Sequence, residues 1–141
     1  MGEQAPHVDV GEISELNGVA RIVRDEAETA ELKADIRSYD TLETSNGRMA
    51  VTFLDDTLIR LTENSQLLID EFVFDPDPNK SKMALNFAKG TARFVTGKLN
   101  KVAKKNITIR TNSATVGIRG TDFTITTNEI GESLIILLPN A

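Results

Sequence analysis

The feature that most constrains the fold is an alternation of apolar and more polar residues with a period of two. Met49, Val51 and Phe53 show it clearly, with Arg48 and Thr52 beside them. Successive side chains of a β-strand point to opposite faces, so this period predicts strands with one buried face. We expect about ten short strands, the number typical of a sandwich, roll or barrel. They are predicted at residues 13–16, 19–23, 49–53, 58–61, 66–74, 83–87, 91–95, 107–110, 123–127 and 134–138.

Turn residues separate these strands. Asn17-Gly18 is a strong hairpin signal and predicts that the strands on either side of it pair. Asp55-Asp56 predicts a second tight hairpin, and Lys89-Gly90 predicts a turn that reverses the chain. Residues 129–132 are expected to turn between the last two strands. Residues 75–79 contain two prolines, which cannot continue a ladder, and predict a surface loop.

Two segments depart from the period of two. In residues 97–105, Leu99, Val102 and Ala103 fall on one face of a helical turn, which predicts a short connecting helix. The lysines of this segment form either a solvated face or a docking face for an acidic partner. Residues 25–34 fit a helical turn or a long polar loop equally well. The predicted fold class is therefore an all-β antiparallel sandwich or roll with one short connecting helix.

The length and charge of the chain limit its organisation and its partners. Its 141 residues fit one domain with one core. We expect a native or engineered tail at residues 1–10 and a single domain at 11–141, whose C-terminal end is either complete or truncated. The net charge of −5 argues against nucleic acid as the main partner. No run is long enough to span a membrane, and the first residues lack the profile of a secretory signal peptide.

The sequence offers little that could carry catalysis. The one histidine, His7, lies in the predicted tail, so no hydrolase triad can be drawn, and the chain has no cysteine. Asp55-Asp56 and the Asp75 to Asp77 pair could hold an ion, but aspartates at turns usually accept hydrogen bonds from the backbone. Tyr39 is the only tyrosine and there is no tryptophan, which disfavours a sugar site. We predict a non-enzymatic protein without cofactor, metal or small-molecule substrate.

One strand-like segment combines glycine with an arginine. Gly117 and Gly120 flank Arg119, and Thr121 and Phe123 follow. Glycine in a strand indicates a bulge, a bend or a close backbone approach. An arginine held there can pair with a carboxylate or donate to carbonyl groups where chains cross. We favour this structural use for the motif, with ligand recognition as the alternative.

The last strand is the candidate contact with a partner. Residues 134–138 are continuously apolar, and Leu134, Ile136 and Leu138 share one face if the segment is extended. An apolar strand near a chain end invites pairing with another chain. The partner is expected to be a protein, either a different one or a second copy of this chain.

Short motifs also occur in a particular order along the chain, and together they resemble the FecR-type domain family over about residues 11–137. The motifs are the glycine-flanked segment at residues 11–20, a segment at 36–44, the strand–acidic turn–strand unit at 47–61, and the closing pattern of Thr111, Ala114, Arg119, Gly120, Thr121 and Phe123. The chain departs from the family pattern at Asp55-Asp56, where Asp-Gly is common, and at Tyr39-Asp40, where Gly-Asp is common.

The resemblance implies a location and a role. The name-giving members are transmembrane signal regulators whose extracytoplasmic domain senses an outer-membrane receptor, and only that domain resembles this chain. It implies a non-enzymatic protein–protein interaction module, periplasmic or secreted, used in signalling or assembly. The alternative is a structural subunit of a filament, an envelope complex or a phage virion. A glycan-binding or hydrolytic domain is a remote alternative.

Overall fold

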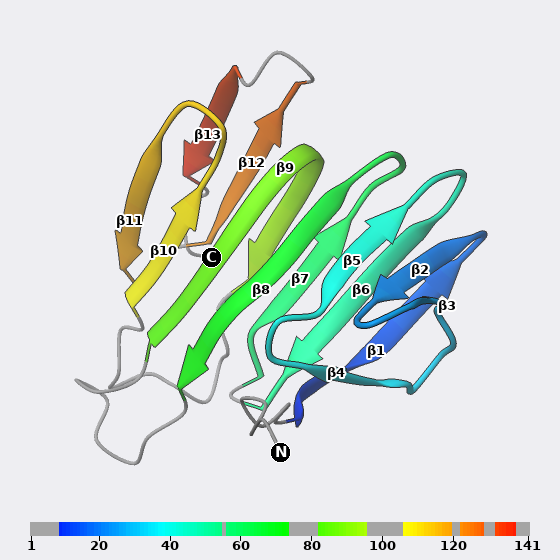
Figure 1. The fold of residues 1–141 in the computed structure, drawn as a ribbon. Coiled ribbons are helices and arrows are strands. Elements are labelled where there is room, and N and C mark those ends of the chain that lie inside the picture. The colour runs from blue at the N-terminus through cyan, green and yellow to red at the C-terminus, as the bar shows by residue number, and fades with distance from the viewer. Residues whose placement is uncertain are drawn as a thin grey trace.

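The computed structural model describes residues 9–54, 56–73, 82–95, 106–119, 122–128 and 132–137, without the side chains of residues 72, 73, 106, 118 and 119. Within these ranges the chain forms 13 strands and no helix, and the sheet curls into a half-barrel (Figure 1). The strands are β1 (Asp9–Asn17), β2 (Ala20–Val23), β3 (Ala27–Thr29), β4 (Asp35–Arg37), β5 (Thr41–Thr44), β6 (Arg48–Phe53), β7 (Leu58–Leu61), β8 (Gln66–Val73), β9 (Lys82–Val95), β10 (Asn106–Arg110), β11 (Thr115–Arg119), β12 (Phe123–Thr127) and β13 (Ser133–Leu137). The all-β prediction is confirmed.

The strands form two layers that share β9. Layer A has the order β4-β1-β6-β7-β9-β12-β13. Layer B has the order β3-β2-β5-β8-β9-β10-β11. Among the described strands the pairing of β9 with β10 is parallel and the other pairings are antiparallel. This is a roll, one of the two architectures that the alternation predicted.

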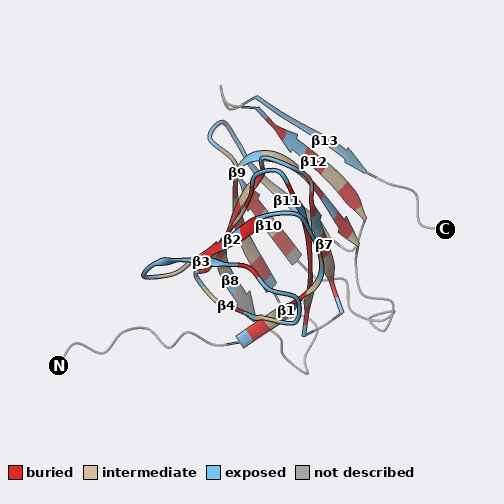
Figure 2. Ribbon diagram, turned by 90° about the vertical axis from the view of Figure 1, so that its right-hand side faces the viewer, coloured by how far each residue is buried: buried red, intermediate tan, exposed pale blue. Residues whose placement is uncertain are grey.

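The inner faces of both layers build one core. Its buried residues alternate along the strands of each layer, as the period of two requires (Figure 2). Phe94 of β9 and Phe123 of β12 are fully buried and stack with ring centroids 4.4 Å apart. The list of core residues also includes Ile13, Leu42, Val51, Ile69, Leu85 and Ile109.

The turn predicted at Lys89-Gly90 is wrong, because β9 runs through it as one strand of 14 residues. Residues before Gly90 pair with β8 and β10 in layer B, and residues from Gly90 onward pair with β12 in layer A. Gly90 has a φ of +99°, a conformation that glycine adopts at little cost. The glycine therefore bends a continuous strand from one layer into the other.

The hairpin predicted at Asn17-Gly18 is also wrong. Strands β1 and β2 do not pair with each other: β1 pairs with β4 and β6, and β2 pairs with β3 and β5. Gly18 has a φ of +81°, and a Cβ there would lie 2.5 Å from the backbone oxygen of Asn46. The positive φ that a hairpin would use serves instead to carry the chain from layer A to layer B.

The remaining predictions divide into three groups. The hairpin at Asp55-Asp56 is confirmed by the antiparallel β6–β7 pair, and the last two strands pair as expected. Residues 25–34 contain the short strand β3 in place of a helical turn or a long loop. The predicted helix at residues 97–105, the loop at 75–79 and the turn residues 129–131 lie outside the described residues.

Candidate interaction site

The roll has two ends, and the end formed by β11 and β13 carries open strand edges. Among the described strands, β13 pairs only with β12, and β11 pairs only with β10 (Figure 1). Each therefore has one side whose backbone groups bond to no other described strand. Free edges of this kind are templates for pairing with another chain.

Strand β13 exposes large apolar side chains on both of its faces. Leu134 and Ile136 lie opposite Thr126 and Thr124 of β12, on the outer face, and are 61% and 50% exposed. Leu137 lies opposite the fully buried Phe123, on the inner face, yet it is 61% exposed. Part of the inner apolar face is therefore left uncovered at β13. Figure 2 shows β13 as an exposed strand at the margin of the roll. We call Leu134, Ile136 and Leu137 the β13 patch.

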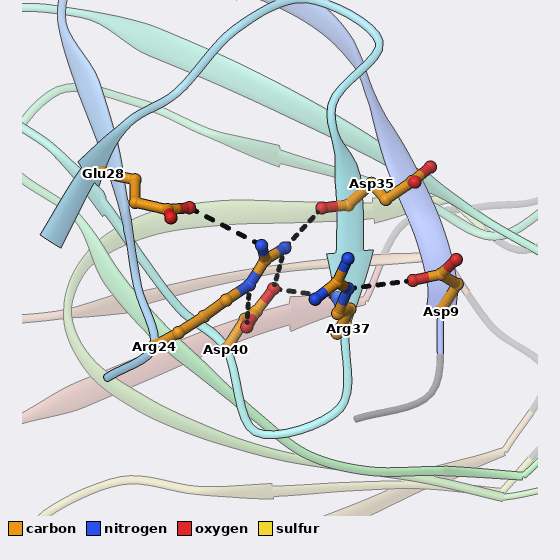
Figure 3. A network of polar contacts seen from close by, with 6 residues as sticks. All are labelled: Asp9, Arg24, Glu28, Asp35, Arg37 and Asp40. Carbon is orange, nitrogen blue, oxygen red and sulfur yellow. Dashed lines mark hydrogen bonds and ion pairs between the residues drawn. The ribbon is translucent and has the colours of Figure 1, made fainter. Parts of the chain in front are cut away.

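The opposite end of the roll is closed by a polar network around Asp40 (Figure 3). Asp40 is fully buried in the link between β4 of layer A and β5 of layer B. Arg24 donates two hydrogen bonds to its carboxylate, from Nε at 2.8 Å and from NH2 at 3.1 Å. The backbone N–H of Arg37 donates a third at 2.8 Å. Buried charge needs this degree of compensation, so the network is built to hold the two layers together.

Neighbouring groups extend the network to the surface. Arg24 NH2 also donates to the backbone oxygen of Asp35 at 2.7 Å, and Arg37 pairs with Asp9 of β1 at 3.1 Å. The hydrogen bond from Arg24 to Asp40 raises the pKa of the Arg24 guanidinium, against the opposing effect of burial. Because the pKa is higher in the folded state, the interaction stabilises the fold fully at pH values below the unfolded-state pKa. This stabilisation is lost only as the pH rises through the folded-state pKa. This contribution therefore persists across neutral pH.

The arginines that line two hollows on the described surface are paired with carboxylates. One, of about 320 Å³, is lined by Arg24 and Arg37, which pair with Asp40 and Asp9. The other, of about 470 Å³, is lined by Arg48 and Arg60. These arginines pair with Glu63 and Glu15. Within the described part of the chain, no three acidic, histidine or cysteine side chains come together as a metal site would require. The described residues include no helix that is long and apolar enough to cross a membrane.

The structure describes the predicted motif only in part. Phe123 is a core residue. Gly117 shows no register shift and no close approach, because a Cβ added there meets nothing within 4 Å. The side chain of Arg119 and the whole of Gly120, Thr121 and Leu138 lie outside the described residues, as do Asp55, Asp75 and Asp77. The structural role of the motif stays a prediction, and so does the part of Leu138 in a contact.

No pattern in the sequence predicts the Arg24–Asp40 pair. Its two members are 16 residues apart and lie on different elements, so no local period connects them. A local signal does exist at Tyr39-Asp40. Tyr39 has a φ of +71°, a conformation usually taken by glycine, and the motif comparison had already marked this position as a departure from Gly-Asp.

A family model described as FecR protein matches residues 40–138, which run from Asp40 through β13. The match begins later than the resemblance at residues 11–137 and ends one residue beyond it. No curated protein and no solved structure matches the chain significantly.

Proposed function

The chain belongs to the FecR protein family, and from that premise we propose that it is a non-enzymatic module that binds a protein partner in signalling outside the cytoplasm. Family membership supports a link to sigma-factor regulation and to protein interaction in general. The location in the periplasm, or in secreted form, follows the family and is part of the proposal. The β13 patch supplies the contact, and the exposure of Leu134, Ile136 and Leu137 is the observation that carries this choice.

The two ends of the roll differ in a way that supports this assignment. The end with β3 and β4 is bound together by the Asp40 network, and its strands are only three residues long. Short edges flanked by charge resist pairing with another chain. The end with β11 and β13 has strands of five residues and exposed apolar side chains. A partner gains most by covering this second end.

Strand addition is the mode of binding that fits β13. An extended segment beside β13 would take its free backbone hydrogen bonds, and side chains on both faces would cover the β13 patch. The segment at residues 119–123 links β11 to β12, that is, layer B to layer A at the same end. We propose that Arg119, Gly120 and Thr121 shape this link and that Leu138 extends the contact.

A second candidate function is a structural subunit of a larger assembly. Its support is that an antiparallel pair of β13 strands from two copies would satisfy the same edge. We expect the signalling module to sediment as a monomer at every concentration, whereas a structural subunit would shift to larger species as concentration rises. Sedimentation velocity over a hundredfold range of concentration separates the two, and a pure monomer throughout excludes assembly through β13.

The proposed contact can be tested by placing a photo-crosslinking residue at Leu134 in the protein expressed in its source cells. We expect one discrete adduct with a different protein, which mass spectrometry identifies. Ile136→Asp should then weaken binding of that purified partner at least about tenfold, the loss of one well-buried apolar contact. Leu32→Asp is the matched control, because Leu32 is 55% exposed and lies before β4 at the other end of the roll.

Each outcome of this experiment decides something. An adduct that forms equally from a crosslinker at Leu32, or partner binding that survives Ile136→Asp, contradicts the β13 patch as the contact. An adduct of the chain with itself favours the structural subunit. Equal losses of partner binding from Ile136→Asp and Leu32→Asp would mean that each introduced aspartate perturbs the fold. This result would remove the support for a local contact.

A further inference from the structure

A row of side chains crosses the outer face of layer A and ends at the β13 patch. Arg60 of β7 lies opposite Arg93 of β9, Arg93 lies opposite Thr124 of β12, and Thr124 lies opposite Ile136 of β13. All four share the outer face, because their neighbours along the strands, such as Ile59, Phe94 and Phe123, are buried. We call Arg60, Arg93, Thr124 and Ile136 the arginine row.

The arginine row places two like charges directly opposite each other. Such pairs destabilise a sheet. Arg60 contacts Glu15 at 3.3 Å, but both side chains are about half exposed, so the pair stabilises little. Arg93 is exposed and forms no ion pair with any other described residue. Within the described residues, the positive charge of Arg93 is therefore compensated by no ion pair, and that of Arg60 only by an exposed one.

Among the arginines whose side chains the structure describes, Arg93 and Arg110 form no ion pair, and of these two only Arg93 lies opposite another arginine. The arginines that pair with acidic side chains are Arg21, Arg24, Arg37, Arg48 and Arg60. The protein as a whole is acidic, with a net charge of −5, so unpaired carboxylates are plentiful elsewhere. Folding alone gives no reason to place Arg93 beside Arg60. An external group of opposite charge would relieve the repulsion and gain a charge-assisted contact.

The position of Arg93 fixes where that group must lie. Strands in a sheet are about 4.8 Å apart, so Arg93 is about 10 Å from Ile136 across two strand spacings. A strand that only adds to the free side of β13 cannot reach it. A segment that runs across the strands in the polyproline II conformation can, because its residues i and i+3 lie on the same face about 9 Å apart. An apolar side chain on Ile136 and a carboxylate three residues away would meet both sites.

We propose that the partner of this chain lays an acidic segment in the polyproline II conformation across the outer face of layer A, with an apolar residue on Leu134 and Ile136 and a carboxylate on Arg93. The inference rests on the proposed function, which assigns the β13 patch to a protein contact. It adds the chemistry of the partner: apolar and acidic residues at a spacing of three. Charge complementarity with Arg93 and Arg60 selects this occupant over a neutral or basic one.

The binding test uses synthetic peptides of stated sequence. Leu-Ser-Ser-Glu repeated three times is the acidic probe, and the same peptide with Gln or Lys in place of Glu provides the comparison. We expect the acidic peptide to bind at least tenfold tighter than the Gln peptide at low ionic strength, by fluorescence anisotropy. Arg93→Glu should abolish this preference. Arg110→Glu should keep it, because Arg110 is an exposed arginine on β10 of layer B.

The outcomes separate this inference from the proposed function. Equal binding of the Glu and Gln peptides, with both lost in Ile136→Asp, overturns the acidic partner and leaves the β13 patch as the contact. A preference for Glu that survives Arg93→Glu overturns the assignment to the arginine row. If no peptide binds, the acidic segment is rejected, and the crosslinking from Leu134 still decides the proposed function.

A second measurement needs no ligand. If Arg60 and Arg93 repel each other in the free protein, Arg93→Glu should raise the melting temperature by about 2 °C in low salt. The gain should vanish in high salt, which screens exposed charges. Arg110→Glu is again the control and should show no gain of this kind. An unchanged or lower melting temperature for Arg93→Glu in low salt would show that repulsion between Arg60 and Arg93 does not destabilise the free protein. It would also remove the reason for an acidic partner.

Discussion

Replacing Asp40 with alanine is expected to lower the free energy of unfolding by about 3–4 kcal/mol, as removal of one partner from a buried ion pair does. The carboxylate is fully buried and accepts hydrogen bonds from Arg24 Nε, Arg24 NH2 and the N–H of Arg37. Alanine would leave a guanidinium that is 19% exposed without its anion, and a backbone donor without its acceptor. Urea unfolding followed by circular dichroism measures the loss.

Two further variants give this prediction its contrast. Asp40→Asn keeps the size of the side chain and one acceptor oxygen, so its loss should fall between the wild type and Asp40→Ala. Glu43→Ala removes the acid of the Arg21–Glu43 pair, whose side chains are 57% and 24% exposed. An exposed pair is worth at most about 1 kcal/mol. If Asp40→Ala costs no more than Glu43→Ala, the network does not hold the β3–β4 end closed.

The strands of this fold are local and could be read from the sequence. Met49, Val51 and Phe53 are buried in β6, where Ala50 is buried as well, and Met83, Leu85 and Phe87 are buried in β9. The layer crossings at Gly18 and Gly90 could not be read. Gly18 and Gly90 adopt positive φ, which serves a hairpin and a layer crossing equally well. Whether a hairpin or a layer crossing forms at each glycine is decided by the distant strands that pair with the segments on either side of it.

The candidate site shows the same division between local and distant causes. The run of apolar residues at 134–138 predicted an exposed end strand, and β13 does expose Leu134 and Ile136. The sequence could not show that Leu137 lies on the core side, because that depends on its register with Phe123. Arg93 faces Arg60 for the same reason: 33 residues of chain separate them, and only the β7–β9 register brings them together.

Replacing Gly90 with alanine is expected to destabilise the fold by about 3–5 kcal/mol, through backbone strain and overpacking together. A side chain at a φ of +99° is strained wherever it points. A Cβ at this position would also lie 2.5 Å from the Cα of Ser65, a fully buried residue. The side chain of Ser65 hydrogen-bonds to both backbone groups of Thr91, so it cannot move away without breaking those bonds. Thermal and urea unfolding both report the loss.

Gly117→Ala is the matched control for this effect, since it makes the same chemical change in another strand. A Cβ on Gly117 meets nothing within 4 Å, and its φ is not in the positive range. Alanine there restricts the unfolded chain without strain and should leave stability unchanged or raise it by up to about 1 kcal/mol. If the two variants lose similar stability, β9 tolerates a side chain at its bend, and the crossing of the layers does not depend on glycine. A large loss at Gly90 alone means that the bend of β9 from one layer into the other depends on a single backbone conformation. In that case the β13 edge, which pairs through β12 to the layer A half of β9, depends on that conformation for its position.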